Sequence, residues 1–168
     1  EEEFSRPVGI EVEATIPNSL PVKRAATTNG DVTLRSVSGD ELTVKSSNGE
    51  ILLESVDAAP KLETVNGDVT ARGLSDLASV KTTNGEVDLD LDGLGADARI
   101  STTNGDIEVG LGGVDARIVA RTTNGEVSIQ GLDVTIDSVG DRRVEGTIGD
   151  GGPTLRIETI NGDVRIVE

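Results

Sequence analysis

The sequence predicts an all-β fold, a single β-solenoid that spans residues 1–168. The dipeptide Asn-Gly recurs seven times, and successive copies are 18, 19 or 20 residues apart except for one gap of 37. Apolar and polar residues alternate on both sides of each copy, which is the pattern of half-buried strands. No segment carries a sustained helical period. A fixed period of this length is the signature of a repeat architecture.

Each repeat unit places the same residue types at the same positions. An apolar residue and, two positions later, a Ser or Thr precede Asn-Gly, and an acid and two alternating apolar residues follow it. In one unit these are Ile100, Thr102, Asp106, Ile107 and Val109. Each unit is therefore expected to form two short strands that meet at a corner. The predicted corner residues are Asn29, Gly30, Asn48, Gly49, Asn66, Gly67, Asn84, Gly85, Asn104, Gly105, Asn124, Gly125, Asn161 and Gly162.

Two architectures fit this pattern. Asn-Gly between alternating strands is a strong hairpin signal, so the chain could form an antiparallel meander. In a solenoid, each unit is instead one coil, and both apolar faces point into a shared interior. Stacked coils require a nearly constant repeat length and the same residue type at each repeat position. A meander allows this regularity but does not require it, so the solenoid is favoured. We expect about eight coils of 18–20 residues with two strands each, a rod of about 40 Å at ~4.8 Å per coil.

Stacking would bring like residues of successive coils into contact. The Asn side chains are expected to form an amide ladder, and the hydroxyl column to satisfy backbone groups at the corner. Residues 1–21 are expected to supply an N-terminal strand and cap. Residues 131–153 break the period and are expected to form an irregular coil. The last coil runs to the end of the sequence without a cap, so we expect either that the protein continues beyond it or that its open edge meets another subunit.

The composition excludes several functions. A net charge of -16 argues against binding to nucleic acid or to anionic membrane surfaces. The chain has no His and no Cys, which excludes Ser-His-Asp and Cys-His catalysis and thiolate or imidazole metal sites. No stretch is apolar for the ~18 residues of a membrane span, and nothing indicates a cofactor. High acidity with more Arg than Lys is typical of salt-adapted proteins, so the sequence predicts a halophilic source.

The stretch at residues 10–56 contains Ile16-Pro17, Thr28-Asn29-Gly30-Asp31-Val32 and Ser38-Gly39-Asp40. These motifs resemble the NGD-repeat, adhesin-like β-solenoid domains of bacteria and archaea, and the resemblance continues to Asn161-Gly162-Asp163. Related solenoids include the bactofilins, which polymerise end to end. The resemblance implies a location in the cell envelope or outside the cell, with tethering through a segment that this chain does not contain. It implies little about chemistry, because the shared residues are corner residues.

Two sets of residues are candidates for chemistry. The acid that follows each Asn-Gly forms a column that could associate with hard cations such as calcium. The period-breaking segment holds the second set, Asp141, Arg142, Arg143 and Asp150. Irregular coils of solenoids often carry sites, and sugar-cleaving β-helices use Asp and Arg without His.

The leading prediction is a non-enzymatic, adhesin-like structural module of the cell envelope that associates with a protein partner or with itself end to end. The alternative is a β-helix that binds or cleaves carbohydrate through the 141–150 segment. The first prediction depends on the structural role of all repeated residues. The second depends on the four side chains of the irregular segment lying together.

Overall fold

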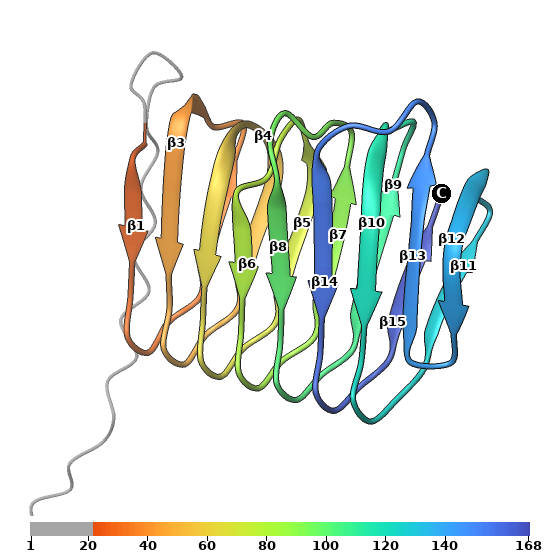
Figure 1. Ribbon diagram of the computed structural model, residues 1–168. Coiled ribbons are helices and arrows are strands. Elements are labelled where there is room, and N and C mark those ends of the chain that lie inside the picture. Colours follow the sequence, from red (N-terminus) through yellow and green to blue (C-terminus); the bar gives the residue numbers. More distant parts are fainter. Residues whose placement is uncertain (1–21) are drawn as a thin grey trace, which may run out of the picture.

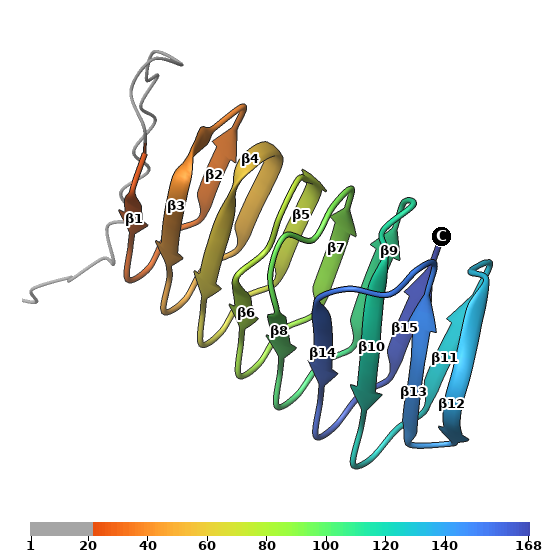
Figure 2. The same cartoon turned by 45° about the horizontal axis from the view of Figure 1, so that its top comes forward.

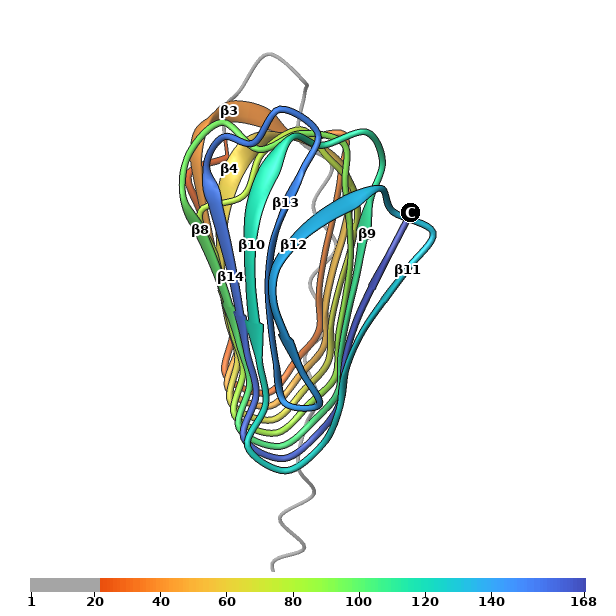
Figure 3. The same cartoon turned by 45° about the vertical axis from the view of Figure 1, so that its right-hand side comes forward.

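The computed structural model describes residues 22–168, which form 15 strands and no helix. The N-terminal strand and cap expected at 1–21 lie outside the described residues. The chain winds between two sheets, A and B, and the coils lie one behind another (Figures 1 and 3). The two strands that flank each Asn-Gly lie in different sheets and pair in parallel with strands of other coils. The solenoid prediction is therefore confirmed, and the antiparallel meander is wrong.

The two sheets share one long strand, β4 (Ile51–Glu63), whose first part lies in sheet B and whose second part lies in sheet A. In spatial order, sheet A contains β1 (Arg24–Ala26), β3 (Ser38–Lys45), β4, β6 (Ser79–Lys81), β8 (Ala98–Ser101), β14 (Thr154–Glu158), β10 (Ala116–Arg121), β13 (Arg143–Ile148) and β12 (Val134–Gly140). Sheet B contains β2 (Val32–Arg35), β4, β5 (Val69–Leu74), β7 (Val87–Leu91), β9 (Ile107–Leu111), β15 (Val164–Val167) and β11 (Val127–Gln130).

The C-terminal coil does not lie at the end of the stack. Strand β14 pairs in parallel with β8 on one side and β10 on the other, and β15 lies in the same way between β9 and β11. Figure 2 shows both strands of this coil between coils that precede it in the chain. We call residues 154–167 the inserted coil. The expectation that the C-terminal coil offers an open edge to another subunit is therefore wrong.

In sheet A, the end of the stack is formed by the irregular segment, residues 131–153, whereas in sheet B it is formed by β11. In place of an eighth coil the irregular segment contains the β12–β13 pair, an antiparallel hairpin that adds to β10. Its register shifts between Ile136 and Ser138, and β12 is the edge strand of sheet A. An irregular edge strand that carries a charge, here Asp137, hinders pairing with a further strand. The solenoid therefore has seven Asn-Gly corners, and the eighth coil expected from the sequence is replaced by this hairpin.

The seven Asn-Gly corners stack by side-chain hydrogen bonds. Each Asn from the second coil onward donates from Nδ2 to Oδ1 of the Asn in the preceding coil, at 2.7–2.8 Å. From the second coil onward, the Ser or Thr of each corner is also buried and donates to the carbonyl of a Gly in the preceding coil, as Thr82 does to Gly67 at 3.3 Å. A Cβ on Gly85 would overlap the carbonyl oxygen of Gly67, so the corner requires glycine.

The interior contains aliphatic side chains from both sheets. Its buried hydrophobic residues are all Val, Ile, Leu or Ala, and in most coils they occupy the columns expected from the alternation. Burial of one such side chain contributes roughly 1.5–3 kcal/mol. Because inward and outward residues alternate along each strand, the polar residues between them form the two outer faces of the solenoid.

Candidate functional site

The outer face of sheet A concentrates arginine where the inserted coil lies. The charged residues of β8, β14, β10 and β13 are five Arg and two Glu, and a sixth Arg stands in the β12–β13 turn. They alternate with buried residues such as Ile100, Ile118 and Ile157, so their side chains lie on the outer face of the sheet. We name this group the arginine cluster: Arg99, Arg117, Arg121, Arg142, Arg143 and Arg156, with Glu145 and Glu158. It has an excess of four positive charges in a chain whose net charge is -16.

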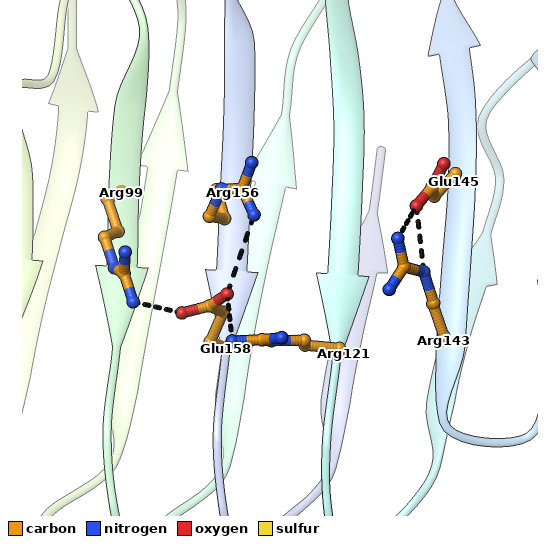
Figure 4. Close-up of polar contacts among 6 residues, drawn as sticks. All are labelled: Arg99, Arg121, Arg143, Glu145, Arg156 and Glu158. Carbon is orange, nitrogen blue, oxygen red and sulfur yellow. Dashed lines mark hydrogen bonds and ion pairs between the residues drawn. The ribbon is translucent and has the colours of Figure 1, made fainter.

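Glu158 is the centre of the cluster. Its side chain is only 10% exposed, and it forms ion pairs with Arg99 of β8, Arg121 of β10 at 2.8 Å and Arg156 of its own strand at 3.8 Å (Figure 4). Strand pairing brings these residues together, because Glu158 lies opposite Ser101 on one side and Arg121 on the other. One carboxylate therefore neutralises only part of the charge of three guanidinium groups.

A second carboxylate, Glu145, lies farther along the same face. Arg143 donates from Nε to its Oε1 at 2.8 Å, and Arg117 approaches it at 3.9 Å. The hydrogen bond from Arg143, with the positive charge of that residue, lowers the pKa of the Glu145 carboxyl. Arg142 enters no ion pair within residues 22–168.

A shallow hollow of about 670 Å³ lies over these side chains. Its charged lining is Arg99, Arg121, Arg142, Arg143 and Glu158, and its rim includes the hydroxyl residues Ser101 and Thr123. Arg donates five N–H groups in a planar fork that matches carboxylate, sulfate or phosphate oxygens. The arrangement can therefore hold an anionic group in front of four guanidinium groups.

The four side chains of the sequence-predicted ligand set do not converge. Asp141 and Arg142 form the β12–β13 turn and Arg143 begins β13, whereas Asp150 lies beyond the opposite end of this strand. The six residues of β13 alone separate the two ends by about 20 Å, at ~3.3 Å per residue. The backbone N–H of Asp150 donates to Asp115 instead. Of the predicted set, only Arg142 and Arg143 line the hollow.

The acid column has a structural role at several corners. Asp31, Asp68, Asp106 and Asp163 each accept a hydrogen bond of 2.8–2.9 Å from the backbone N–H of the acid in the next coil. The short Asp side chain thus satisfies a corner donor that strand pairing leaves unpaired. Within the described part of the chain, no group of three or more acidic side chains is placed to hold a metal ion.

Sequence reasoning missed Arg99, Arg117, Arg121, Arg156 and Glu158 as members of one site. Arg121 and Glu158 occupy the mostly charged position between the apolar residue and the hydroxyl residue of their repeat units, and nothing in the repeat relates them to Arg99, Arg117 and Arg156. The signal that unites them is the order of the coils, because Arg99 and Arg121 approach one carboxylate only when β14 lies between their strands. That order is not visible in the repeat.

A comparison with protein families identifies one match. The family model described as Toastrack DUF4097 matches residues 22–167, which is most of the chain and all but the last described residue. No curated protein and no solved structure matches the chain significantly. None of residues 22–168 belongs to a helix with the length and hydropathy needed to cross a bilayer.

Proposed function

This chain belongs to the Toastrack DUF4097 family, and from that premise we propose that it is a non-enzymatic structural module of the cell envelope that contacts an anionic partner through the arginine cluster. The observation that carries this proposal is the separation of charge. A chain with net charge -16 places six of its eleven arginines on one part of one face. Such a local excess provides an attractive surface for anions, although the whole molecule repels them.

The polar residues of the repeat support a structural role. The Asn, Thr and Asp side chains at the corners are used in hydrogen bonds between coils, for example Asn104 to Asn84 and Thr102 to Gly85. Cleavage of a glycosidic bond usually needs two carboxyl groups within about 10 Å of each other. Asp141 and Asp150 are about twice as far apart, since the whole of β13 lies between them at ~3.3 Å per residue. Binding without cleavage is therefore the function that this geometry favours.

A rigid rod suits an adhesive or scaffolding role. The core is continuous through all seven coils, and the ladder of Asn side chains connects every corner. The module would hold the arginine cluster in a fixed geometry, which lowers the entropic cost of binding an extended partner. In the envelope, such a partner would be another surface polymer.

The acidity of the remaining surface fits a salt-adapted source. Asp and Glu at the corners repel one another at low ionic strength, and salt screens this repulsion. We expect the unfolding midpoint to rise with salt concentration, and circular dichroism measured across a salt series checks this. A midpoint independent of salt would count against salt adaptation.

The proposal is tested by binding of the fluorescently labelled domain to purified envelope preparations from its source organism. We expect saturable binding that is reduced at least tenfold in the variant Arg142→Glu/Arg143→Glu. The matched control is Arg35→Glu/Arg165→Glu, which changes the charge equally on sheet B and should bind as the wild type does. Absence of binding to every envelope preparation, or equal loss in both variants, would overturn the proposal.

A further inference from the structure

We propose that the hollow of the arginine cluster binds an acidic polysaccharide, with the carboxylate or sulfate groups of successive sugars held by Arg99, Arg121, Arg142 and Arg143. This inference rests on the proposed contact function and names its ligand. It requires that the guanidinium groups have free donors, that neutral sugars are not the preferred ligand, and that the charges are spaced for a polymer.

The donors are accessible. Arg99, Arg121 and Arg143 each have side chains more than half exposed, at 59%, 53% and 58%, even though each already contacts a carboxylate. Arg142 is exposed and makes no ion pair within the described chain. Each fork uses only some of its five N–H groups on Glu158 or Glu145, so outward donors remain for a ligand oxygen.

The lining selects against neutral sugars. Protein sites for neutral sugar rings commonly stack them on aromatic side chains, and residues 22–168 contain no aromatic residue. Recognition at this face must therefore depend on charge and on hydrogen bonds. Ser101 and Thr123 at the rim can donate to or accept from sugar hydroxyls. Acidic sugars offer both kinds of group.

The cluster is spaced for an extended chain. The strands β8, β14, β10 and β13 are consecutive in sheet A, so their outward side chains recur every ~4.8 Å across the sheet. This spacing is comparable with the length of one sugar ring. Arg121 and Arg143 lie on adjacent strands, whereas Glu158 on β14 lies between Arg99 and Arg121, so those two are two strand spacings apart. A polysaccharide laid across the strands would present adjacent acidic groups to Arg143 and Arg121 and a further one, two sugars along, to Arg99.

The surroundings disfavour a wider and denser polyanion. Three stacked corners lie next to the hollow. The acids that directly follow their Asn-Gly dipeptides are Asp106, Asp163 and Glu126. A nucleic acid duplex carries one charge per ~1.7 Å of axis, and it would extend over these carboxylates. A single narrow chain can lie on the arginines alone. Double-stranded DNA is therefore expected to bind more weakly than an acidic polysaccharide.

The test is titration calorimetry of the purified protein with polygalacturonate, dextran sulfate, neutral dextran and double-stranded DNA. We expect binding to at least one of the two acidic polysaccharides and none to neutral dextran. Polygalacturonate alone would indicate carboxylate, and dextran sulfate alone would indicate sulfate. Arg142→Glu/Arg143→Glu should weaken binding about 100-fold, since loss of each charged contact costs about a factor of ten. The control Arg35→Glu/Arg165→Glu should change it less than about threefold.

The outcomes separate this inference from the function on which it rests. Envelope binding without binding to either acidic polysaccharide would overturn the ligand class and leave the contact function standing. Tighter binding to DNA, or equal binding to neutral dextran, would also overturn the ligand class. Polysaccharide binding that both double variants weaken equally would place the site elsewhere on the molecule.

Discussion

The side-chain amide of Asn161 donates a hydrogen bond of 2.7 Å to Oδ1 of Asn104, although 57 residues separate them. On its other side, Asn161 accepts a bond of 2.8 Å from Asn124. The last corner of the chain thus lies between two corners that are neighbours in sequence. The same placement brings Glu158 between Arg99 and Arg121, so the order of the coils creates both the continuous core and the arginine cluster.

Removal of the inserted coil should open the solenoid. Leu155, Ile157, Val164 and Ile166 are each 0% exposed, and burial of four such side chains contributes about 6–12 kcal/mol. This is comparable with the whole stability of a typical domain, ~5–15 kcal/mol. We expect a chain ending at residue 153 to lose its cooperative thermal transition in circular dichroism.

A synthetic peptide of residues 154–168 should restore that transition, because it supplies the strands that pair with β8 and β10 in sheet A and with β9 and β11 in sheet B. The same peptide with Ile157→Asp is the control and should fail. A truncated chain that melts as the full chain does would contradict the role assigned to the inserted coil.

The buried hydroxyl column should contribute to stability. Thr122 is 7% exposed, and its Oγ1 donates to the carbonyl of Gly162 at 2.8 Å. Thr122→Val keeps the shape but leaves that carbonyl without its partner, which costs about 1–3 kcal/mol. Thr123→Val, at the adjacent exposed position, should cost less than about 0.5 kcal/mol. Urea denaturation measures both values, and equal effects would argue against a structural role for the column.

Glu63 should make stability dependent on pH. The hydrogen bond from Lys45, with a second from Lys61, lowers the pKa of Glu63 in the folded chain. A lowered folded pKa means that this group stabilises the fold above its unfolded pKa, about 4.3 for Glu. The contribution is lost as the pH falls through the folded pKa. Glu63→Gln should therefore show a flatter decline of unfolding free energy at acid pH than the wild type.

The control for this measurement is Glu41→Gln. Glu41 lies exposed on β3 of the same sheet and enters no ion pair within residues 22–168. The unfolding free energy of the Glu41→Gln variant should decline at acid pH as that of the wild type does. If the unfolding free energy of Glu63→Gln declines at acid pH as steeply as that of the wild type, the Lys45 contact does not persist in solution.

Glu158→Gln should lower the stability of the fold and strengthen anion binding. Loss of the carboxylate leaves Arg99 and Arg121 without their shared partner. Because both are more than half exposed, we expect a cost of only about 1 kcal/mol. The excess positive charge of the cluster rises by one, so binding of acidic polysaccharide should tighten several-fold. Glu54→Gln, which removes the partner of Arg35 on sheet B, should leave binding unchanged. Weaker binding by Glu158→Gln would mean that Glu158 orients the arginines for the ligand.

The sequence predicted the coils but not their order, and the reason is physical. Stacking requires like residues at like positions, so the columns that contain Asn104, Thr102 and Ile100 identify strands, corners and core. Because all units have the same residue types at these positions, the strands of the last unit could pair with those of any other unit. Its position is determined by residues 131–153, because β13 pairs with one side of β10 and leaves only the other side for β14. The arginine cluster depends on this choice, and for that reason only Arg142 and Arg143 were found from the sequence.

The order of the coils is tested most directly by cross-linking, since the chain contains no cysteine. Glu108 of β9 lies opposite Arg165 of β15, and Arg165 lies opposite Ser128 of β11. Glu108→Cys/Arg165→Cys should form a disulfide readily, because neighbouring strands are ~4.8 Å apart. Glu108→Cys/Ser128→Cys should not, because two strand spacings exceed the ~7 Å limit for a disulfide. Efficient oxidation of the second pair and none of the first would show that the coils stack in sequence order, and would contradict both the inserted coil and the arginine cluster.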